Sequence, residues 1–321
     1  MSLPPLARVT GLLTPCLLAV LASCGTSSMD VLHTGTGGTA SGSTSSTASS
    51  AGPSGTGGAT ASSSAGSGGS AVACKRGLAY GQDSVADLTV LSKGVSWWYN
   101  WATAPDNTAV AAAHAGLGVE FVPMVWGQAF VANLAAQVPA DARYLLGFNE
   151  PNFGSQANLT PAQAAALWPQ VEAVAKAENL AIVSPAVNYC GSPCNVTNPF
   201  DWLTEFFAAC PGCKVDYIAM HWYACTGSAL TSYLQQFEST FTQPLWLTEF
   251  SCLDATDTSE PVQEAYMNTA LSILEADPRV VRYAWFTGRS TGSPGVDLLG
   301  ADGTLTALGQ NYVGYPQSCK P

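Results

Sequence analysis

Positive charge is scarce in this sequence. Its 321 residues include 11 Lys and Arg against 22 Asp and Glu, which gives a net charge of −11. That balance disfavours nucleic acids and anionic polymers as partners and suits a neutral ligand. Histidine is scarce as well, and neither His114 nor His221 stands at ligand spacing to a cysteine, so the sequence predicts no metal site. Nothing else in the sequence calls for a cofactor, and we expect none.

Long apolar runs are absent beyond the first residues, so we expect no transmembrane helix in the mature chain. The early run at residues 11–21, after Arg8, is too short to span a bilayer and indicates a signal peptide. It leads to Leu21-Ala22-Ser23-Cys24, which resembles a bacterial lipoprotein cleavage site. Residues 1–23 would then be removed, and Cys24 would become the lipidated first residue. Ordinary secretion, with cleavage at a nearby small residue, is the alternative.

Residues 24–72 consist mostly of Ser, Gly, Thr and Ala. Such a segment cannot bury enough apolar surface to offset its conformational entropy, so we expect a disordered tether. We expect an exported protein, either a cell-surface or outer-membrane lipoprotein or a secreted one. It would be a monomer that contacts a membrane only through the lipid anchor.

From residue 74 onward, short β-rich runs alternate with longer helical stretches. Strands are expected at residues 76–80, 95–99, 120–125, 144–149, 181–186, 215–223, 244–250 and 280–286. Helices are expected at residues 109–116, 161–179, 199–210, 228–241 and 260–277. This alternation over residues 73–321 predicts a single α/β domain, a (β/α)8 TIM barrel. A doubly wound sheet is disfavoured because no Gly-rich phosphate loop follows the first strand.

Eight of the ten cysteines fall in this expected domain, and an even number in an exported chain predicts up to four disulfides. Cys210 and Cys213 are expected to form a structural pair in a loop rather than a redox motif. Cys225 and Cys252 each lie two residues beyond the end of a neighbouring strand. Adjacent strands lie about 4.8 Å apart, within disulfide range, so we expect these two to be bonded.

Two expected strands deliver a glutamate at their C-terminal ends. Gly147-Phe148-Asn149-Glu150-Pro151 closes the fourth strand, and Leu245-Trp246-Leu247-Thr248-Glu249-Phe250 closes the seventh. Strand alternation places Glu150 on the face of Phe148, and Glu249 on the face of Leu247. At the mouth of a barrel the two carboxylates would face each other, as glycosidic bond cleavage requires. A solvated strand end or a buried ion pair is the alternative, which the scarcity of Lys and Arg disfavours.

Strings spread from the first to the seventh strand resemble glycoside hydrolase family 128, within the retaining clan A of (β/α)8 glycosidases. They are Lys75-Arg76-Gly77-Leu78-Ala79-Tyr80, Ser96-Trp97-Trp98-Tyr99-Asn100-Trp101, Gly147-Phe148-Asn149-Glu150-Pro151, Ser184-Pro185-Ala186, His221-Trp222-Tyr223 and Trp246-Leu247-Thr248-Glu249-Phe250. The resemblance implies an endo-β-1,3-glucanase in which Glu150 is the general acid/base and Glu249 the nucleophile. It also implies that Asn149 hydrogen-bonds a sugar hydroxyl and that β-1,3-glucan is the partner.

The chemistry of these roles makes further predictions. A general acid must hold its proton, so we expect Glu150 in the drier environment, and hydrogen-bond donors such as Tyr223 near Glu249. His221 and Tyr223 share one face of the sixth strand, where His221 would orient a carboxylate or sugar, or simply be a core residue. Other residues that we expect in the cleft lie near strand ends: Trp285, Asn100, Trp101 and Trp126. Trp97 and Trp98 must face opposite ways, so at most one points into the barrel.

Two other functions compete with hydrolysis of β-1,3-glucan. The chain could be a β-glucan-binding surface lipoprotein with little or no activity, although both glutamates are present. It could also be another clan A hydrolase acting on a different β-linked glycan, such as β-1,4-mannan. Whether cleavage is endo or exo depends on loops at the cleft ends, which the sequence does not reveal.

Overall fold

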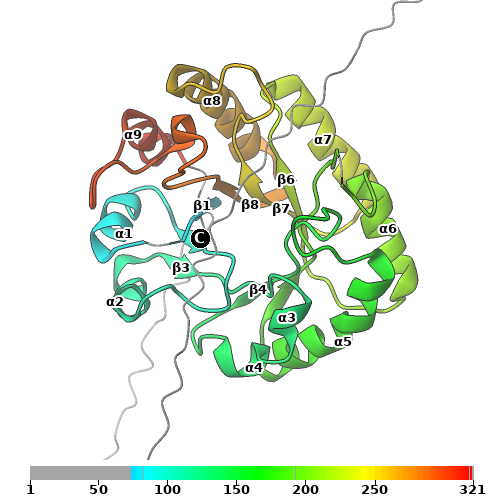
Figure 1. Cartoon of the computed structure of the whole chain (residues 1–321). Helices are drawn as coiled ribbons and strands as arrows, with labels where there is room; N and C mark the ends of the chain where they lie inside the picture. The colour runs from blue at the N-terminus through cyan, green and yellow to red at the C-terminus, as the bar shows by residue number, and fades with distance from the viewer. Residues whose placement is uncertain (1–73, 82, 192, 318, 320–321) are drawn as a thin grey trace, which may run out of the picture. The chain divides into compact units, whose positions relative to one another are not determined.

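The computed structural model describes residues 74–321 apart from residues 82, 192, 318, 320 and 321 (Figure 1). The expected signal peptide, the lipidation site Cys24 and the tether at residues 24–72 lie outside the described residues. Among the helices of the described part, none combines the length and the apolar character needed to cross a bilayer.

Eight parallel strands of the described chain form a closed barrel. They are β1 (Arg76–Ala79), β2 (Trp97–Tyr99), β3 (Glu120–Phe121), β4 (Tyr144–Leu146), β5 (Ala181–Val183), β6 (Ile218–Trp222), β7 (Leu245–Phe250) and β8 (Val280–Trp285). Six of them pair in the order β3-β2-β1-β8-β7-β6, and β4 pairs with β5. Single parallel bridges, Met124 to Leu146 and Val183 to Tyr217, join the two sheets and close the ring. The predicted (β/α)8 barrel is confirmed.

Helices surround this ring of strands (Figure 1). In chain order they are α1 (Val85–Leu91), α2 (Thr108–Ala113), η1 (Ala115–Leu117), α3 (Gln128–Val131), α4 (Leu134–Gln137), α5 (Pro161–Ala177), α6 (Pro199–Ala209), α7 (Gly227–Thr240), α8 (Glu260–Ala276), η2 (Pro294–Val296) and α9 (Ala307–Gly314). Helix α5 begins where local chemistry favours it, because Thr160 and Gln163 form a capping box and Pro161 occupies the first turn. The short helices α1, α3 and α4 lie in segments where the sequence predicts no helix.

Two apolar cores lie on the two faces of the strands. Small residues and rings fill the barrel interior, among them Ala79, Ala284, Trp97 and Trp246. The outer core lies between strands and helices, and Trp98 packs there against Phe121 with ring centroids 5.0 Å apart. Adjacent Trp97 and Trp98 therefore face opposite ways, as the alternation predicts.

Four disulfides cross-link the described chain. The expected bond between Cys225 and Cys252 is present, with Cα atoms 4.6 Å apart. It joins the segments that follow β6 and β7, beside Glu249. The others are Cys74–Cys319, Cys190–Cys194 and Cys210–Cys213. The last lies between α6 and β6, as expected of a structural pair.

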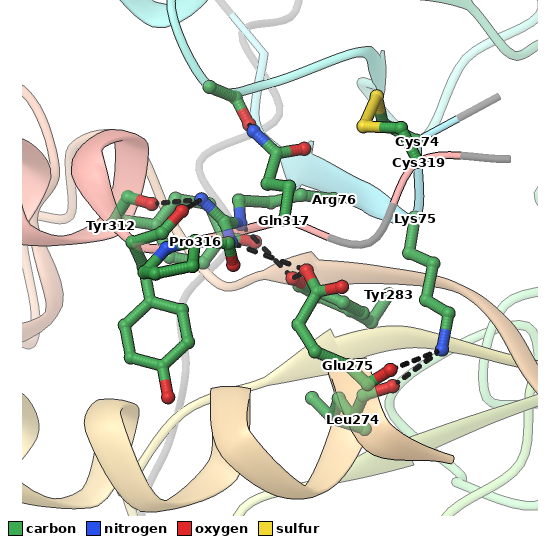
Figure 2. A network of polar contacts seen from close by, with 12 residues as sticks. Cys74, Lys75, Arg76, Leu274, Glu275, Tyr283, Tyr312, Pro316, Gln317 and Cys319 are labelled. Carbon is green, nitrogen blue, oxygen red and sulfur yellow. Dashed lines mark hydrogen bonds and ion pairs between the residues drawn. A yellow bond between two sulfur atoms is a disulfide. The ribbon is translucent and has the colours of Figure 1, made fainter. Parts of the chain in front are cut away.

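The two ends of the described chain are tied together at the N-terminal side of β1 (Figure 2). Beside the Cys74–Cys319 bond, the Lys75 ammonium donates to the carbonyl oxygens of Leu274 at 2.9 Å and Asp277 at 2.7 Å. The Arg76 guanidinium donates to three carbonyl oxygens of the C-terminal segment, those of Tyr312, Tyr315 and Pro316. This network lies at the end of the barrel where the strands begin, opposite the ends that carry the glutamates.

Candidate active site

The backbone turns sharply where β4 delivers Glu150. The amide of Asn149 donates to the carbonyl oxygen of Trp126 at 2.9 Å, and Asn149 bridges to Ala186 beyond β5. Glu150 itself has φ of +38°, in the left-handed region that non-glycine residues rarely occupy. Trp101, beyond β2, also lies in this region with φ of +61°. Strained backbone of this kind concentrates at functional sites, where surrounding contacts hold it in place.

Glu249 reaches the same site because β7 does not alternate regularly. Trp246 packs inside the barrel and Leu247 in the outer core, so simple alternation would also point Glu249 outward. The pairing register of β7 with β8 shifts between Leu247 and Phe250, and Glu249 turns inward instead. The prediction that Leu247 and Glu249 share a face is therefore wrong, although the predicted meeting of the carboxylates does occur.

One imidazole ring lies between the two glutamates. His221 is fully buried on β6, and its Nδ1 lies 3.0 Å from Oε1 of Glu150. Its Nε2 lies 3.5 Å from Oε1 of Glu249, close enough for charge attraction but not aligned as a hydrogen bond. The two carboxylates therefore face each other across a single ring, and His221 contacts both.

Three neutral donors surround the Glu249 carboxylate. The hydroxyl of Tyr99 and the indole Nε1 of Trp101 each donate to Oε1 at 2.8 Å. The hydroxyl of Tyr223 donates to Oε2. Donors of this kind favour the ionised form of a carboxylate. The prediction that Tyr223 lies near Glu249 is confirmed.

The relative exposure of the two glutamates differs from expectation. The Glu150 side chain is 10% exposed and that of Glu249 is 5% exposed. Glu150 is thus the more solvent-exposed of the two, and the prediction that it occupies the drier environment is wrong. The two acids differ instead in their hydrogen bonds: Glu150 is bonded to His221, whereas Glu249 accepts from Tyr99, Trp101 and Tyr223.

The charges of the glutamates act on their neighbours. Burial opposes the cationic form of His221, but Glu249 and the hydrogen-bonded Glu150 outweigh it and raise the pKa of this imidazole above its ordinary value. Burial, and then the charge of Glu249, raise the pKa of Tyr99 and Tyr223 well above that of a free phenol. Both hydroxyls therefore keep their protons and remain donors.

Asn149 and Trp126 lie beside Glu150. The side-chain Nδ2 of Asn149 donates to Oε1 of Gln156 at 3.3 Å. Its Oδ1 is buried and has no donor among the described residues. Trp126 is half-buried, and its carbonyl oxygen accepts from the backbone N–H of Asn149. An acceptor without a donor is suited to receive a hydrogen bond from a ligand hydroxyl.

Two residues expected in the cleft lie elsewhere. Trp285 is fully buried in the outer core, where its ring packs on Phe250 and its Nε1 donates to Val296. The Asn100 amide nitrogen donates to Ala104 and Asp106, so it stabilises the turn after β2. The Trp285 prediction is wrong because alternation along β8 directs its side chain outward, whereas the Asn100 side chain is held by the turn after β2.

Two site residues escaped the sequence prediction. Phe286, one position beyond Trp285, faces the site, and its ring contacts Trp101 at 5.9 Å and Tyr223 at 5.8 Å. Tyr99, which holds Glu249, could have been found because it lies two residues from both Trp97 and Trp101 on one strand face.

In the described part of the chain, no group of three or more His, Cys, Asp or Glu side chains is arranged to hold a metal ion.

A family model described as a glycosyl hydrolase catalytic core matches residues 77–312. The chain also resembles the crystal structure of a GH128 subgroup II endo-β-1,3-glucanase from Sorangium cellulosum. Their sequences are 51% identical over 76% of this chain and 99% of that one, with a TM-score of 0.72. A subgroup I endo-β-1,3-glucanase from Amycolatopsis mediterranei, in complex with laminaritriose, is 32% identical over 75% of this chain and 99% of that one, with a TM-score of 0.63.

A curated relative, Alkali-sensitive linkage protein 1 of Schizosaccharomyces pombe, is 32% identical over 255 residues. The match spans 76% of this chain but 45% of that protein, so the chain corresponds to less than half of it. The Sorangium and Amycolatopsis structures, by contrast, are covered almost completely. On the strength of these matches and of the paired glutamates in a (β/α)8 barrel, the chain belongs to glycoside hydrolase family 128.

Proposed function

We propose that this protein is a retaining endo-β-1,3-glucanase that cleaves glucans of the laminarin and curdlan type. The observation that carries the proposal is the Glu249 carboxylate, which three neutral donors hold facing Glu150 across His221. A neutral polysaccharide also suits an acidic chain with net charge −11. The solved relatives are endo-β-1,3-glucanases, and one holds laminaritriose.

In the first step, a carboxylate oxygen of Glu249 attacks the anomeric carbon as the glycosidic bond breaks. Glu150 gives its proton to the leaving oxygen, and a covalent glycosyl-Glu249 ester forms. In the second step, Glu150, now ionised, takes a proton from water, and that water's oxygen attacks the same carbon. The ester bond breaks, both glutamates return to their starting states, and the anomeric configuration is retained.

The neighbouring residues have supporting roles in this mechanism. The donors Tyr99, Trp101 and Tyr223 orient Glu249 for attack. His221 orients the Glu150 carboxyl group. Asn149 offers its Oδ1 to a sugar hydroxyl. The sugar that is attacked packs against the rings of Phe286 and Trp126.

A panel of glycans tests this function. Laminarin and curdlan should release short reducing oligosaccharides, whereas β-1,4-mannan and cellulose should not. A Glu249→Ala protein should still bind laminarioligosaccharide but not cleave it. Wild-type protein that binds laminarin and never cleaves it would instead establish a binding role. Cleavage of mannan would indicate another clan A specificity.

We also propose that the protein acts outside the cell as a monomer, held by lipid at Cys24 through the tether at residues 24–72. Support comes from the sequence alone, namely the Leu21-Ala22-Ser23-Cys24 string and the Ser-, Gly- and Thr-rich segment after it. In a bacterial host, wild-type protein should incorporate labelled fatty acid and fractionate with membranes. Cys24→Ala protein should lose the label. Wild-type protein that appears unlabelled in the medium would show ordinary secretion instead.

A further inference from the structure

Exposed aromatic rings are rare on this protein, and one of them lies on the rim of the catalytic end. In the part of the chain that the structure describes, the exposed large apolar side chains are Val85, Phe130 and Tyr189. Tyr189 is the most exposed, at 47%, although its neighbours Asn188 and Cys190 are buried. An exposed ring between two buried residues is held out from the surface rather than covered by it.

Behind Tyr189, its ring is supported by other aromatic side chains. It packs on Tyr233 of α7 with ring centroids 5.6 Å apart and on Phe200 of α6 at 6.2 Å. Tyr233 in turn packs on Trp222 at 4.5 Å, and Trp222 immediately precedes the site residue Tyr223. This stack fixes one side of the Tyr189 ring and leaves the rest of its surface open to solvent.

The loop that carries Tyr189 is attached to the loop that follows Glu150. Cys190 and Cys194 are disulfide-bonded, and Phe153 pairs with Cys194 in an antiparallel bridge. Asn152 Nδ2 donates to the carbonyl oxygen of Asn188 at 2.7 Å, and Asn195 Nδ2 donates to that of Pro151 at 2.7 Å. We call residues 151–154 together with residues 188–191 and 193–198 the ledge. These bonds make the ledge a rigid extension of the turn that positions Glu150.

Tyr233, the ring behind Tyr189, lies within electrostatic reach of Glu150. Burial, and then the charges of Tyr189 and Glu150, raise the pKa of Tyr233 well above its ordinary value. The ledge belongs to the β4 and β5 side of the barrel mouth. Of the side chains around Glu249, Tyr99 and Trp101 on the β2 side and Phe286 after β8 lie across the barrel mouth from the ledge, whereas Tyr223, just beyond β6, adjoins the stack behind Tyr189.

We propose that Tyr189 is a subsite on the leaving-group side of the cleft, where its exposed ring stacks on a glucose unit beyond the cleaved bond. The inference rests on the proposed function, in which Glu150 protonates the leaving oxygen and Glu249 holds the other sugar. Because the ledge adjoins the turn that carries Glu150, the part of a glucan that extends beyond Glu150 from the cleaved bond would contact the ledge. Sugar rings pack their C–H faces on aromatic rings, and a ring held from behind loses little freedom on binding.

Kinetics on two substrates test the subsite. Laminarihexaose places glucose units on both sides of the cleaved bond, whereas 4-nitrophenyl β-laminaribioside has no sugar on the leaving-group side. Tyr189→Ala should lower kcat/KM for laminarihexaose on the order of tenfold and leave the aryl substrate within about twofold. Tyr189→Phe should retain wild-type values, because stacking needs the ring and not the hydroxyl. Val85→Ala, which shortens another exposed apolar side chain, is the matched control and should change neither substrate.

Melting temperatures separate binding from folding in these variants, and Tyr189→Ala should melt within a few degrees of Val85→Ala. An equal loss on both substrates, or no loss on either, would overturn the subsite and leave the proposed function intact. Wild-type protein that fails to cleave laminarin would overturn the proposed function, and the subsite with it.

Discussion

The two ends of this barrel differ in how their buried charged side chains are paired. Where the strands begin, Arg282 lies among the rings of Tyr144, Trp246 and Trp97, with its guanidinium carbon 4.5, 4.7 and 5.3 Å from their centroids. Its charge is balanced by Glu120, 2.5 Å away. Where the strands end, Glu150 and Glu249 face each other, and among the described residues the titratable base in contact with them is His221.

This difference separates stability from function within one core. A buried cation that is paired and packed between aromatic faces closes the bottom of the barrel. At the top two glutamates share one histidine, and a carboxylate there suits a developing cationic sugar. We therefore expect changes at the bottom to affect folding and changes at the top to affect catalysis.

The largest expected effect is at Glu249. Glu249→Gln keeps the size of the side chain and removes the nucleophilic charge, so hydrolysis of laminarin should fall roughly ten-thousandfold or more. The free energy of unfolding should remain the same or rise, because one buried charge is lost. Reducing-end assays and urea unfolding measure the two quantities. A variant that loses activity only because it unfolds would break the contrast between the ends.

At the opposite end, Arg282→Met should reverse this pattern. It leaves Glu120 without one of its two arginine partners and removes the cation from its aromatic surroundings, so unfolding should become easier by about 3 kcal/mol. The kcat of the folded fraction should stay near wild type. Adding Glu120→Gln should recover part of the lost stability. A large fall in kcat with unchanged stability would contradict the division.

A further carboxyl group, Asp83, tests whether the catalytic end carries a cost in stability. Burial, and then Asp87 and Asp106, raise its pKa to about 8, against the opposing charge of Arg289. Because the unfolded value of 3.8 is lower, the unfolded chain ionises first. Stability should therefore fall as pH rises between these two values and level off above pH 8.

The variant Asp83→Asn should lack this loss and be more stable than wild type by roughly 2–4 kcal/mol at pH 7. Below about pH 4 the two proteins should converge. Urea unfolding at several pH values measures the difference. Parallel stability profiles for the two proteins would show that Asp83 does not titrate in this way.

The smallest expected effect concerns the donors to Glu249. Trp101→Phe keeps an aromatic ring and removes one hydrogen bond to a charged group, so kcat should fall about tenfold. Tyr99→Phe removes the other donor to the same oxygen and is the matched comparison. Both should melt near wild type. An unchanged kcat in both would mean that Tyr223 alone holds the nucleophile.

Much of this architecture could be predicted from local pattern. Glu150 and Glu249 were found because each closes an apolar strand, and Cys225 with Cys252 because neighbouring strands have a fixed separation. His221 and Tyr223 share a face in the structure and both contact Glu249, as period-two alternation requires. The prediction that Trp285 lines the cleft was wrong by one position. Ala284 faces the barrel interior, so alternation directs Trp285 outward and Phe286 inward.

By itself, the sequence determined the repeat of strands and helices, the two acids at strand ends and the spacing of the cysteines. These features depend on backbone periodicity and on residues close together in the chain. The tertiary structure alone decided that a register shift turns Glu249 inward, that Glu150 is the more exposed acid and that Tyr99 and Trp101 donate to Glu249. Each of these depends on which distant segments pack together, and no local pattern records that choice.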